Sequence, residues 1–319
     1  MVSSRNKLLA LSIAIVMLSV AAFAVVGCGD ADEPADEPAE GEYPSGSVTI
    51  ASTDFSEPWI LAEIVKVLLE ENGNLDVNHT NNIQGSTVLH AGMESGDFDM
   101  YVSWTGTQFT GVLEMEITDE WRDREKVFDY VHDEFQERYN ATWLPPLGFD
   151  NTYALCVRRE FAEEHGLETV SDIRSIAPEV EVSMDATFMD RIGDGWNDFM
   201  EHYDLDFARG ISMDYGLLYR AVAEGDVDAA IAYSTDGRVS ALDLVILEDD
   251  MNFFPPYDGA IVARNDALEE FPQIEEVLSV MWGAFDEGTM AGLNSQVDVD
   301  ERDYQDVARD FCEEMGWID

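Results

Sequence analysis

The sequence predicts an α/β protein whose two lobes are joined by two crossing strands and face each other across a cleft. Three observations point to this fold class. Runs of β-forming residues alternate with stretches of helical periodicity, one strand end is repeated about half a chain further on, and an aromatic residue stands at the start of, or just before, each of two strands that we expect to cross between the lobes. With 319 residues, of which 46% are hydrophobic, the chain can form two cores of ordinary size.

The first of the repeated strand ends runs from Gly96 to Thr107 (Gly-Asp-Phe-Asp-Met-Tyr-Val-Ser-Trp-Thr-Gly-Thr). Gly-Asp ends a helix, a buried strand follows at 98–102, and Trp104 stands where the strand gives out into a loop. In an open α/β sheet, ligands bind at the carboxyl ends of strands. An aromatic ring there, next to hydroxyls and a glycine that allows close approach, predicts one wall of a small-molecule site.

The second strand end, Gly225 to Gly237, has the same Gly-Asp-apolar-Asp opening and the same apolar strand. Tyr233 stands at the same offset from its glycine as Trp104 does from Gly96. For either stretch alone, common helix-to-strand punctuation and an aromatic core residue would be the favoured interpretation. The matched offset favours two similar lobes whose rings face one cleft.

The elements of the first lobe follow from hydrophobic periodicity, which predicts strand, helix, strand, helix and strand with parallel neighbours. The expected strands are 47–52, 75–81 and 98–102, and the expected helices are 60–71, 87–94 and 119–139. Asp54 or Ser56 is the expected N-cap of the first helix. Residues 143–149 contain two prolines and are expected to be extended.

A strand at 152–157 is expected to cross into the second lobe, where the alternation of helices and strands begins again. The expected helices there are 159–165, 189–203 and 215–224, and the expected strands are 179–184, 210–213, the strand within 225–237, and 242–247. A second crossing strand at 259–264 returns to the first lobe, which helices from 266 onward, at 274–286 and 303–315, then cover. The first lobe is therefore 46–149 plus 253–319, and the second is 150–252. This layout is typical of hinged proteins whose lobes close on a ligand.

The two crossings carry aromatic residues at corresponding places, because Tyr153 begins the outgoing strand and Tyr257 precedes the returning one. With Trp104 and Tyr233, four rings would line the cleft, whereas Tyr219 is assigned to a helix core. Ring faces attract a cation that cannot donate hydrogen bonds, such as trimethylammonium, and each contact contributes about 0.5–2 kcal/mol. Four such contacts could account for micromolar binding, which corresponds to about −8 kcal/mol.

A carboxylate on the same ligand would need donors, and the candidates are Arg191, Thr107, Ser234 and Thr235. A planar guanidinium is suited to holding both oxygens of a carboxylate. Arg191 is equally consistent with a surface salt bridge to Asp190 or Asp194, so its spacing leaves both interpretations open.

Five segments resemble the osmoprotectant (glycine betaine/choline/carnitine) substrate-binding proteins of ABC transporters, and the resemblance extends over roughly Ser47 to the C-terminus. The segments are Thr-Asp-Phe-Ser-Glu-Pro-Trp-Ile-Leu-Ala-Glu-Ile at 53–64, the 96–107 strand end, Phe-Asp-Asn-Thr-Tyr-Ala-Leu at 149–155, Ala-Tyr-Ser-Thr-Asp-Gly-Arg at 232–238 and Leu-Glu-Asp-Asp-Met-Asn-Phe-Phe-Pro-Pro-Tyr at 247–257. The resemblance implies a type II periplasmic-binding-protein fold. It implies a ligand site at Trp104, Tyr153, Tyr233 and Tyr257, with polar contacts from Thr107, Asn151 and Arg191.

Three departures from the family pattern bear on the ligand. The family usually has Tyr where Trp104 stands and an acidic residue where Ser103 stands, and some members have Gln where Pro58 stands. The resemblance still implies capture of a quaternary-ammonium compatible solute, foremost glycine betaine, and its delivery to an ABC transporter permease. Choline, carnitine or another quaternary amine as ligand, and a sensory module that docks a receptor, are the alternatives.

An enzyme on the same two-lobe fold is a rival from another class. The sequence offers no activated nucleophile, no P-loop and no His-based dyad, and its five histidines do not cluster. We therefore expect neither enzymatic activity nor a cofactor. Cys156 and Cys312 lack metal-ligand spacing, so no metal site is expected and lone buried thiols are the favoured interpretation.

The N-terminus is typical of a lipoprotein signal. Arg5 and Lys7 precede an apolar run at 8–26, and Val-Val-Gly-Cys then ends at Cys28. A membrane-spanning anchor is the alternative, because about 20 apolar residues can cross a bilayer. The small-residue cleavage site and the acidic, proline-rich stretch that follows favour a signal peptide at 1–27 and a lipidated cysteine with a linker at 28–45. The protein would then be extracytoplasmic and bound to the membrane through its lipid.

The charge balance is extreme, with 17 Lys and Arg against 67 Asp and Glu and a net charge of −50. Such a surface repels nucleic acid, so no nucleic-acid partner is expected, and the protein is expected to be a monomer. At molar salt the Debye length falls to about 3 Å, which screens the repulsion among carboxylates. The composition therefore indicates adaptation to high salt.

Overall fold

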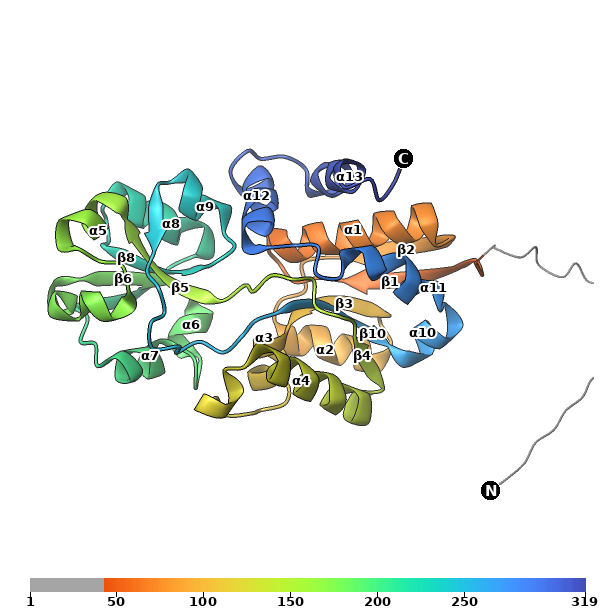
Figure 1. Cartoon of the computed structure of the whole chain (residues 1–319), viewed down its shortest axis with the longest axis horizontal. Helices are drawn as coiled ribbons and strands as arrows, with labels where there is room; N and C mark the ends of the chain where they lie inside the picture. Colours follow the sequence, from red (N-terminus) through yellow and green to blue (C-terminus); the bar gives the residue numbers. More distant parts are fainter. Residues whose placement is uncertain (1–42) are drawn as a thin grey trace, which may run out of the picture. The chain divides into compact units, whose positions relative to one another are not determined.

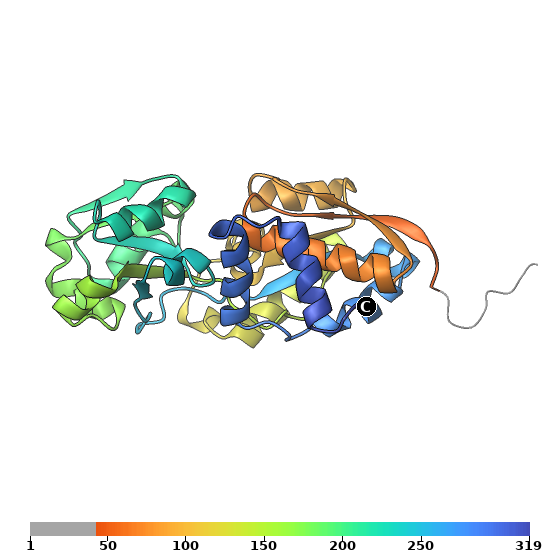
Figure 2. The same ribbon diagram turned by 90° about the horizontal axis from the view of Figure 1, so that it is seen from above.

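The computed structural model describes residues 43–319. The predicted signal peptide, the lipidation of Cys28 and most of the acidic linker lie outside the described residues. Within this part of the chain, no helix is both long enough and apolar enough to cross a membrane. The described residues form two α/β lobes, each built on its own sheet (Figures 1 and 2).

Each sheet has five strands, in the order β2-β1-β3-β10-β4 in the first and β7-β6-β8-β5-β9 in the second. The strands are β1 (Gly46–Ala51), β2 (Leu75–Thr80), β3 (Met100–Trp104), β4 (Ala141–Trp143), β5 (Tyr153–Arg158), β6 (Glu181–Met184), β7 (Arg209–Ser212), β8 (Ala229–Tyr233), β9 (Leu244–Ile246) and β10 (Gly259–Arg264). β1 lies parallel to β2 and β3, as the alternation of strands and helices predicts. β10 and β5 run antiparallel to their neighbours, since they follow the two crossings of the chain between the sheets.

The first lobe carries the first sheet and most of the helices. They are α1 (Ser56–Asn72), α2 (Ser86–Ser95), α3 (Thr105–Gly111), α4 (Arg124–Tyr139), α10 (Asn265–Glu270), α11 (Gln273–Leu278), α12 (Glu287–Asp298) and α13 (Tyr304–Glu314), with 3₁₀ turns η1 (Asp119–Trp121) and η4 (Ser279–Met281). The second lobe has α5 (Arg159–His165), η2 (Val170–Ser175), η3 (Ala177–Glu179), α6 (Ala186–Asp190), α7 (Trp196–Tyr203), α8 (Tyr215–Glu224) and α9 (Gly237–Ala241).

β3 shows how a strand inside the first lobe is buried on both faces. Met100, Val102 and Trp104 belong to the core formed with α1, whereas Tyr101 packs into the core formed with α2 and α4. A strand covered by helices on both sides needs a nearly continuous apolar run, which explains why this stretch shows no polar alternation. Figure 1 shows α1 and α13 on one side of this sheet and α2 and α4 on the other.

The start of α1 differs from the expectation. Its N-cap is Phe55, which makes no side-chain capping bond, so neither Asp54 nor Ser56 has that role. Ser56 is the first helical residue, and its hydroxyl donates a hydrogen bond to Asp298 of α12. The side chain that was expected to cap the helix therefore joins two distant parts of the chain.

Five other stretches also differ from the sequence expectations. The helix expected at 274–286 is α11 followed by the 3₁₀ turn η4, which ends at Met281. The loop expected after Trp104 is the helix α3. The helix expected at 119–139 is divided into η1 and α4, with Asp123 capping α4, and the helix expected at 189–203 is divided into α6 and α7. Gly193 interrupts the latter with a φ of 93°, a left-handed value that suits glycine. α12 was not expected, because Gly288 and Gly292 weaken its helical signal.

Both cysteines of the described part are free and buried. Cys156 lies in β5 and Cys312 in α13, on different lobes. Burial raises the pKa of each thiol to about 12, so both stay protonated at neutral pH. The expectation of lone buried thiols is therefore confirmed.

Candidate functional site

A cavity of about 240 Å³ lies where the strand ends of the two sheets meet the crossing segments. It is lined by residues of both lobes. All seven residues of the ligand site that the resemblance implies are in its lining: Trp104, Thr107, Asn151, Tyr153, Arg191, Tyr233 and Tyr257. Side chains that lie up to 153 positions apart in sequence are thus collected around one space.

Trp104 and Tyr233 end β3 and β8, and therefore lie in different sheets, as their matched offsets predict. The repeated glycines explain the match. Gly96 and Gly225 end α2 and α8 in the left-handed conformation, with φ values of 80° and 82°. Each strand then starts from the same kind of helix end, so its last residue reaches the same place relative to its sheet.

Tyr153 contacts both of the other tyrosines of the cavity. Tyr153 and Tyr233 are partners across the antiparallel ladder of β5 and β8, and their ring centres are 4.9 Å apart. The Tyr257 ring meets Tyr153 edge-on at 5.9 Å. A Cβ at Gly106 would come within 2.8 Å of the Tyr257 ring, so glycine is needed there. The group that approaches the backbone closely at this glycine is therefore the ring of Tyr257.

A fifth ring, Phe55, was not predicted. It lines the cavity and stacks on Trp104, with 5.4 Å between ring centres, and on Tyr233, with 6.2 Å and nearly parallel planes. The sequence signal was available, because Phe55 follows the end of β1 as Trp104 ends β3. From the sequence, that stretch is expected to start a helix and contributes to the family resemblance, but it is not assigned to the site.

Arg191 combines both of the interpretations that its spacing left open. It lines the cavity, and its Nε donates to Asp194 at 2.6 Å, although this ion pair is buried rather than on the surface. Its Nη2 also donates to Thr110 at 2.8 Å and to Tyr257 at 3.3 Å, and both of these belong to the first lobe. Burial lowers the pKa of Arg191, but Tyr257, Asp194 and Tyr153 raise it by more, so the guanidinium stays charged.

The other two donor candidates do not line this cavity. The Ser234 hydroxyl donates to the backbone carbonyl of Asp150 and accepts from the backbone N–H of Thr152, so it holds the crossing segment. Thr235 is buried, and its hydroxyl donates to Glu57. Their expected role as donors to a ligand is therefore not supported, because protein groups already use these hydroxyls.

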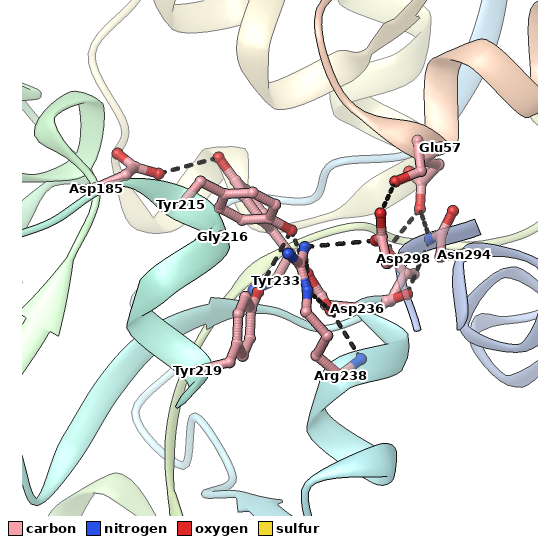
Figure 3. Close-up of polar contacts among 12 residues, drawn as sticks. Glu57, Asp185, Tyr215, Gly216, Tyr219, Tyr233, Asp236, Arg238, Asn294 and Asp298 are labelled. Atoms are coloured by element: carbon pink, nitrogen blue, oxygen red, sulfur yellow. Dashed lines mark hydrogen bonds and ion pairs between the residues drawn. The ribbon is translucent and has the colours of Figure 1, made fainter. Parts of the chain in front are cut away.

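Glu57 was also not predicted as part of this region. Glu57 is 1% exposed, and its carboxylate accepts hydrogen bonds from Trp104, Asn151, Thr235 and Asn294. Burial raises the pKa of Glu57 to about 7, although the four hydrogen bonds lower it. Figure 3 shows Glu57 and Asn294 beside a second polar cluster between the lobes.

That second cluster is centred on Arg238 of α9. Its guanidinium pairs with Asp236 at 2.7 Å and with Asp298 of α12 at 3.4 Å, and it lies over the rings of Tyr215 and Tyr219 (Figure 3). Tyr219 is fully buried in the core of the second lobe, as expected. The cluster joins a helix of the second lobe to a helix of the first.

The expectation that the protein has no histidine-based dyad was wrong. The Ser52 hydroxyl lies 2.7 Å from Nε2 of His79, and Nδ1 of that ring lies 3.3 Å from Glu63, so a serine–histidine–carboxylate chain is present. Ser52 is fully buried and does not line the cavity, so no substrate could reach its hydroxyl. These contacts instead connect the end of β1 with β2 and α1. Across residues 43–319, no group of His, Cys, Asp and Glu residues is arranged to hold a metal ion.

Comparison with known proteins gives a consistent result. The model of the OpuAC family, the substrate binding domain of the ABC-type glycine betaine transport system, matches residues 46–314. The carnitine transport binding protein OpuCC of Listeria monocytogenes is 33% identical over 283 residues, which cover 88% of this chain and 91% of that protein. The glycine-betaine-binding protein of Pseudomonas aeruginosa is 32% identical over 292 residues, which cover 88% and 92%.

A crystal structure described as a glycine betaine/carnitine/choline ABC transporter has the same fold. It superposes with a TM-score of 0.77 at 32% identity, covering 85% of this chain and 100% of that one. These relatives are solute-binding proteins, which confirms the expectation that the chain is not an enzyme. The chain belongs to the family of substrate-binding domains of ABC-type glycine betaine transport systems.

Proposed function

We propose that this protein captures a quaternary-ammonium compatible solute, foremost glycine betaine, and delivers it to a membrane permease for osmoprotective uptake. The observation that carries the proposal is the set of rings around one cavity. Trp104, Tyr153, Tyr233 and Tyr257 come from both lobes and both crossings, and Phe55 adds a fifth ring. Rings can hold a methylated cation without the desolvation that a buried carboxylate partner would require.

The polar side of the cavity supports a ligand that also carries a carboxylate. Arg191 stays charged, and Thr107 and Asn151 also line the cavity. Nδ2 of Asn151 donates one hydrogen to Glu57 at 2.7 Å, which leaves its second hydrogen for a ligand. Glycine betaine presents one trimethylammonium group and one carboxylate, and so matches both sides of the cavity.

A specific observation favours hydroxylated quaternary amines as second candidates. Oδ1 of Asn151 and the hydroxyl of Thr53 are buried and have no hydrogen-bond partner among the described residues, and both residues line the cavity. The hydroxyl of choline or carnitine could donate to such an acceptor, whereas glycine betaine has no donor. Tighter binding of choline or carnitine than of glycine betaine would therefore indicate that these acceptors bind the ligand hydroxyl.

The N-terminal sequence supports the remainder of the proposal. Cleavage before Cys28 and lipidation of its thiol would keep the protein outside the cytoplasm, tethered to the membrane by the acidic linker. A tethered binding protein stays close to its permease, which raises the effective concentration of loaded protein at the transporter. The protein would act as a monomer, with one cavity in each chain.

Calorimetry at molar KCl tests the ligand. Glycine betaine, proline betaine, carnitine and choline would be titrated in parallel, with glycine as the matched control, because it has the same carboxylate but an ammonium group that can donate hydrogen bonds. We expect micromolar binding of glycine betaine and no measurable binding of glycine. Absence of binding by all four quaternary amines would refute the proposal. Tighter binding of choline or carnitine would replace glycine betaine as the principal ligand.

A further inference from the structure

A buried carboxylate joins the ring-lined cavity to the contact between the two lobes. We propose that Glu57 is a positioning residue that couples the orientation of the Trp104 indole to the closure of the lobes. The inference rests on the proposed function to the extent that Trp104 is taken as a ligand-contacting ring. Glu57 does not line the cavity of about 240 Å³ itself, so its role would be exerted through its neighbours.

The Glu57 carboxylate accepts four hydrogen bonds, two at each oxygen. Oε1 accepts from Nε1 of Trp104 at 3.1 Å and from Nδ2 of Asn151 at 2.7 Å. Oε2 accepts from the hydroxyl of Thr235 at 2.6 Å and from Nδ2 of Asn294 at 2.9 Å. An ionised carboxylate has about four acceptor positions, so these four donors saturate it. A neutral amide at this position would satisfy fewer of them.

The four donors come from different parts of the fold. Trp104 and Asn294 belong to the first lobe, Asn151 to the outgoing crossing and Thr235 to the second lobe, next to the end of β8. Movement of the second lobe away from α1 would therefore break the hydrogen bond from Thr235 to the Glu57 carboxylate. The hydrogen bond that spans the lobes and the one that orients the indole thus end on the same carboxylate.

Within residues 43–319, Glu57 has no cationic partner. The charged residues that line the small gap beside Glu57 are Asp236 and Asp298, and Arg238 is shared between these two aspartates. Next to this cluster, a Cβ on Gly237 would lie 2.5 Å from Cα of Ser295, so α9 and α12 are in backbone contact. Neutral donors alone thus compensate the carboxylate, and their number matters because no ion pair replaces them.

The first experiment follows the indole directly. In protein labelled with ¹⁵N-tryptophan, the Nε1–H resonance of Trp104 is assigned by its loss in Trp104→Phe. We expect Glu57→Gln to shift this resonance upfield, because a carboxylate is a stronger acceptor than an amide. The matched control is Glu63→Gln, which changes a second buried carboxylate of α1 that bonds to His79 instead, and it should leave the resonance in place.

The second experiment follows closure. Small-angle scattering should show a more open ligand-free protein for Glu57→Gln than for the parent or Glu63→Gln. The dissociation constant for glycine betaine should rise by about five- to a hundred-fold, as expected for buried donors left unsatisfied in the closed state. Thr235→Val removes the donor from the second lobe and should also shift the Trp104 resonance. The effects of Glu57→Gln and Thr235→Val on the dissociation constant should be less than additive.

The outcomes separate this inference from the proposed function. If no quaternary amine binds the parent, the proposed function fails, while the resonance and the scattering still test Glu57. The inference is wrong if Glu57→Gln changes the resonance and the scattering no more than Glu63→Gln does. It is also wrong if Thr235→Val leaves the Trp104 resonance unmoved. Because Thr235→Val retains Glu57, it provides this test even if Glu57→Gln does not fold.

Discussion

The guanidinium carbon of Arg191 lies 5.8 Å from the centre of the Tyr153 ring and 5.9 Å from that of Tyr257. The cavity thus has a resident cation against two of its rings, and Asp194 holds it there at 2.6 Å. The Arg191 guanidinium repels the ammonium group of a zwitterionic ligand and attracts its carboxylate. We therefore expect the ammonium of a bound betaine to face Trp104 and Tyr233, and its carboxylate to face Arg191.

Arg191→Ala tests this orientation. We expect the variant to weaken glycine betaine by about 2–5 kcal/mol, because the ligand carboxylate would be left buried and unpaired. Choline has no carboxylate and should lose much less. Calorimetry with both ligands measures the difference, and equal weakening of the two would remove Arg191 from this role.

Three controls are needed for Arg191→Ala, because the change also leaves Asp194 buried without its cation. Thermal melting shows whether the fold is destabilised independently of the ligand. Arg191→Lys keeps a positive charge but has no planar fork, so it should retain part of the betaine affinity. Arg264→Ala removes a partly exposed ion pair with Asp266, away from the cavity, and should change neither affinity.

Trp104 tests the ring argument. Trp104→Ala should weaken binding by about 1–2 kcal/mol or more, because one ring face is lost. Trp104→Tyr should keep most of the affinity, whereas Trp104→Leu retains apolar bulk but has no quadrupole. Equal binding by the Tyr and Leu variants would show that burial, rather than cation–π attraction, accounts for the contribution of this residue.

Fluorescence provides a second measurement on the same residue. Saturating ligand should change the environment of Trp104 and hence the tryptophan emission of the parent. Trp104→Tyr should lose much of this response, although the chain has six other tryptophans. A response that persists in full would place the reporting tryptophan elsewhere.

The parts of the site that were predicted are those with a local sequence signature. Trp104 and Tyr233 follow matched helix ends, and β5 and β10 have apolar runs that match their observed bounds to within one residue. Glu57 carried no such signal. Its partners Thr235 and Asn294 are 178 and 237 positions away, so its role follows only from tertiary structure. The burial of the Arg191–Asp194 ion pair also follows only from tertiary structure, because the spacing of the two residues indicates that they are close but not that they are buried.

Cys28 tests the anchor. If the signal peptide is cleaved before this residue, the mature protein begins with a lipidated cysteine. Intact-mass measurement of protein extracted from membranes should give the mass of the chain from Cys28 plus its lipid. Cys28→Ser should abolish lipidation and release the protein from the membrane fraction. A mass that corresponds to an unmodified Met1 start would contradict the prediction.

Salt dependence follows from the net charge of −50. Carboxylates repel one another in dilute buffer and are screened at molar salt, so the melting temperature should rise with KCl concentration. KCl is preferred to sulfate, which also strengthens apolar burial by exclusion from the surface. A melting temperature that does not change between low and molar KCl would contradict adaptation to high salt.

The pH dependence of stability tests the burial of Glu57. Because burial raises its pKa from 4.5 to about 7, the folded protein binds more protons at this group than the unfolded chain does between these values. The contribution is fully present below pH 4.5 and is lost as the pH rises to 7, so the free energy of unfolding should fall over this range. A shift of this size corresponds to about 3 kcal/mol.

Other carboxylates titrate in the same range, and burial raises the pKa of Asp150 to about 6. The informative quantity is therefore the difference in the free energy of unfolding between the parent and Glu57→Gln, measured by urea denaturation at constant molar KCl. The variant lacks the titrating group but keeps Asp150, so contributions common to both proteins cancel. The advantage of the parent should shrink by about 3 kcal/mol from pH 4.5 to pH 7. Parallel curves would mean that Glu57 titrates alike in the folded and unfolded states, as a solvated carboxylate would.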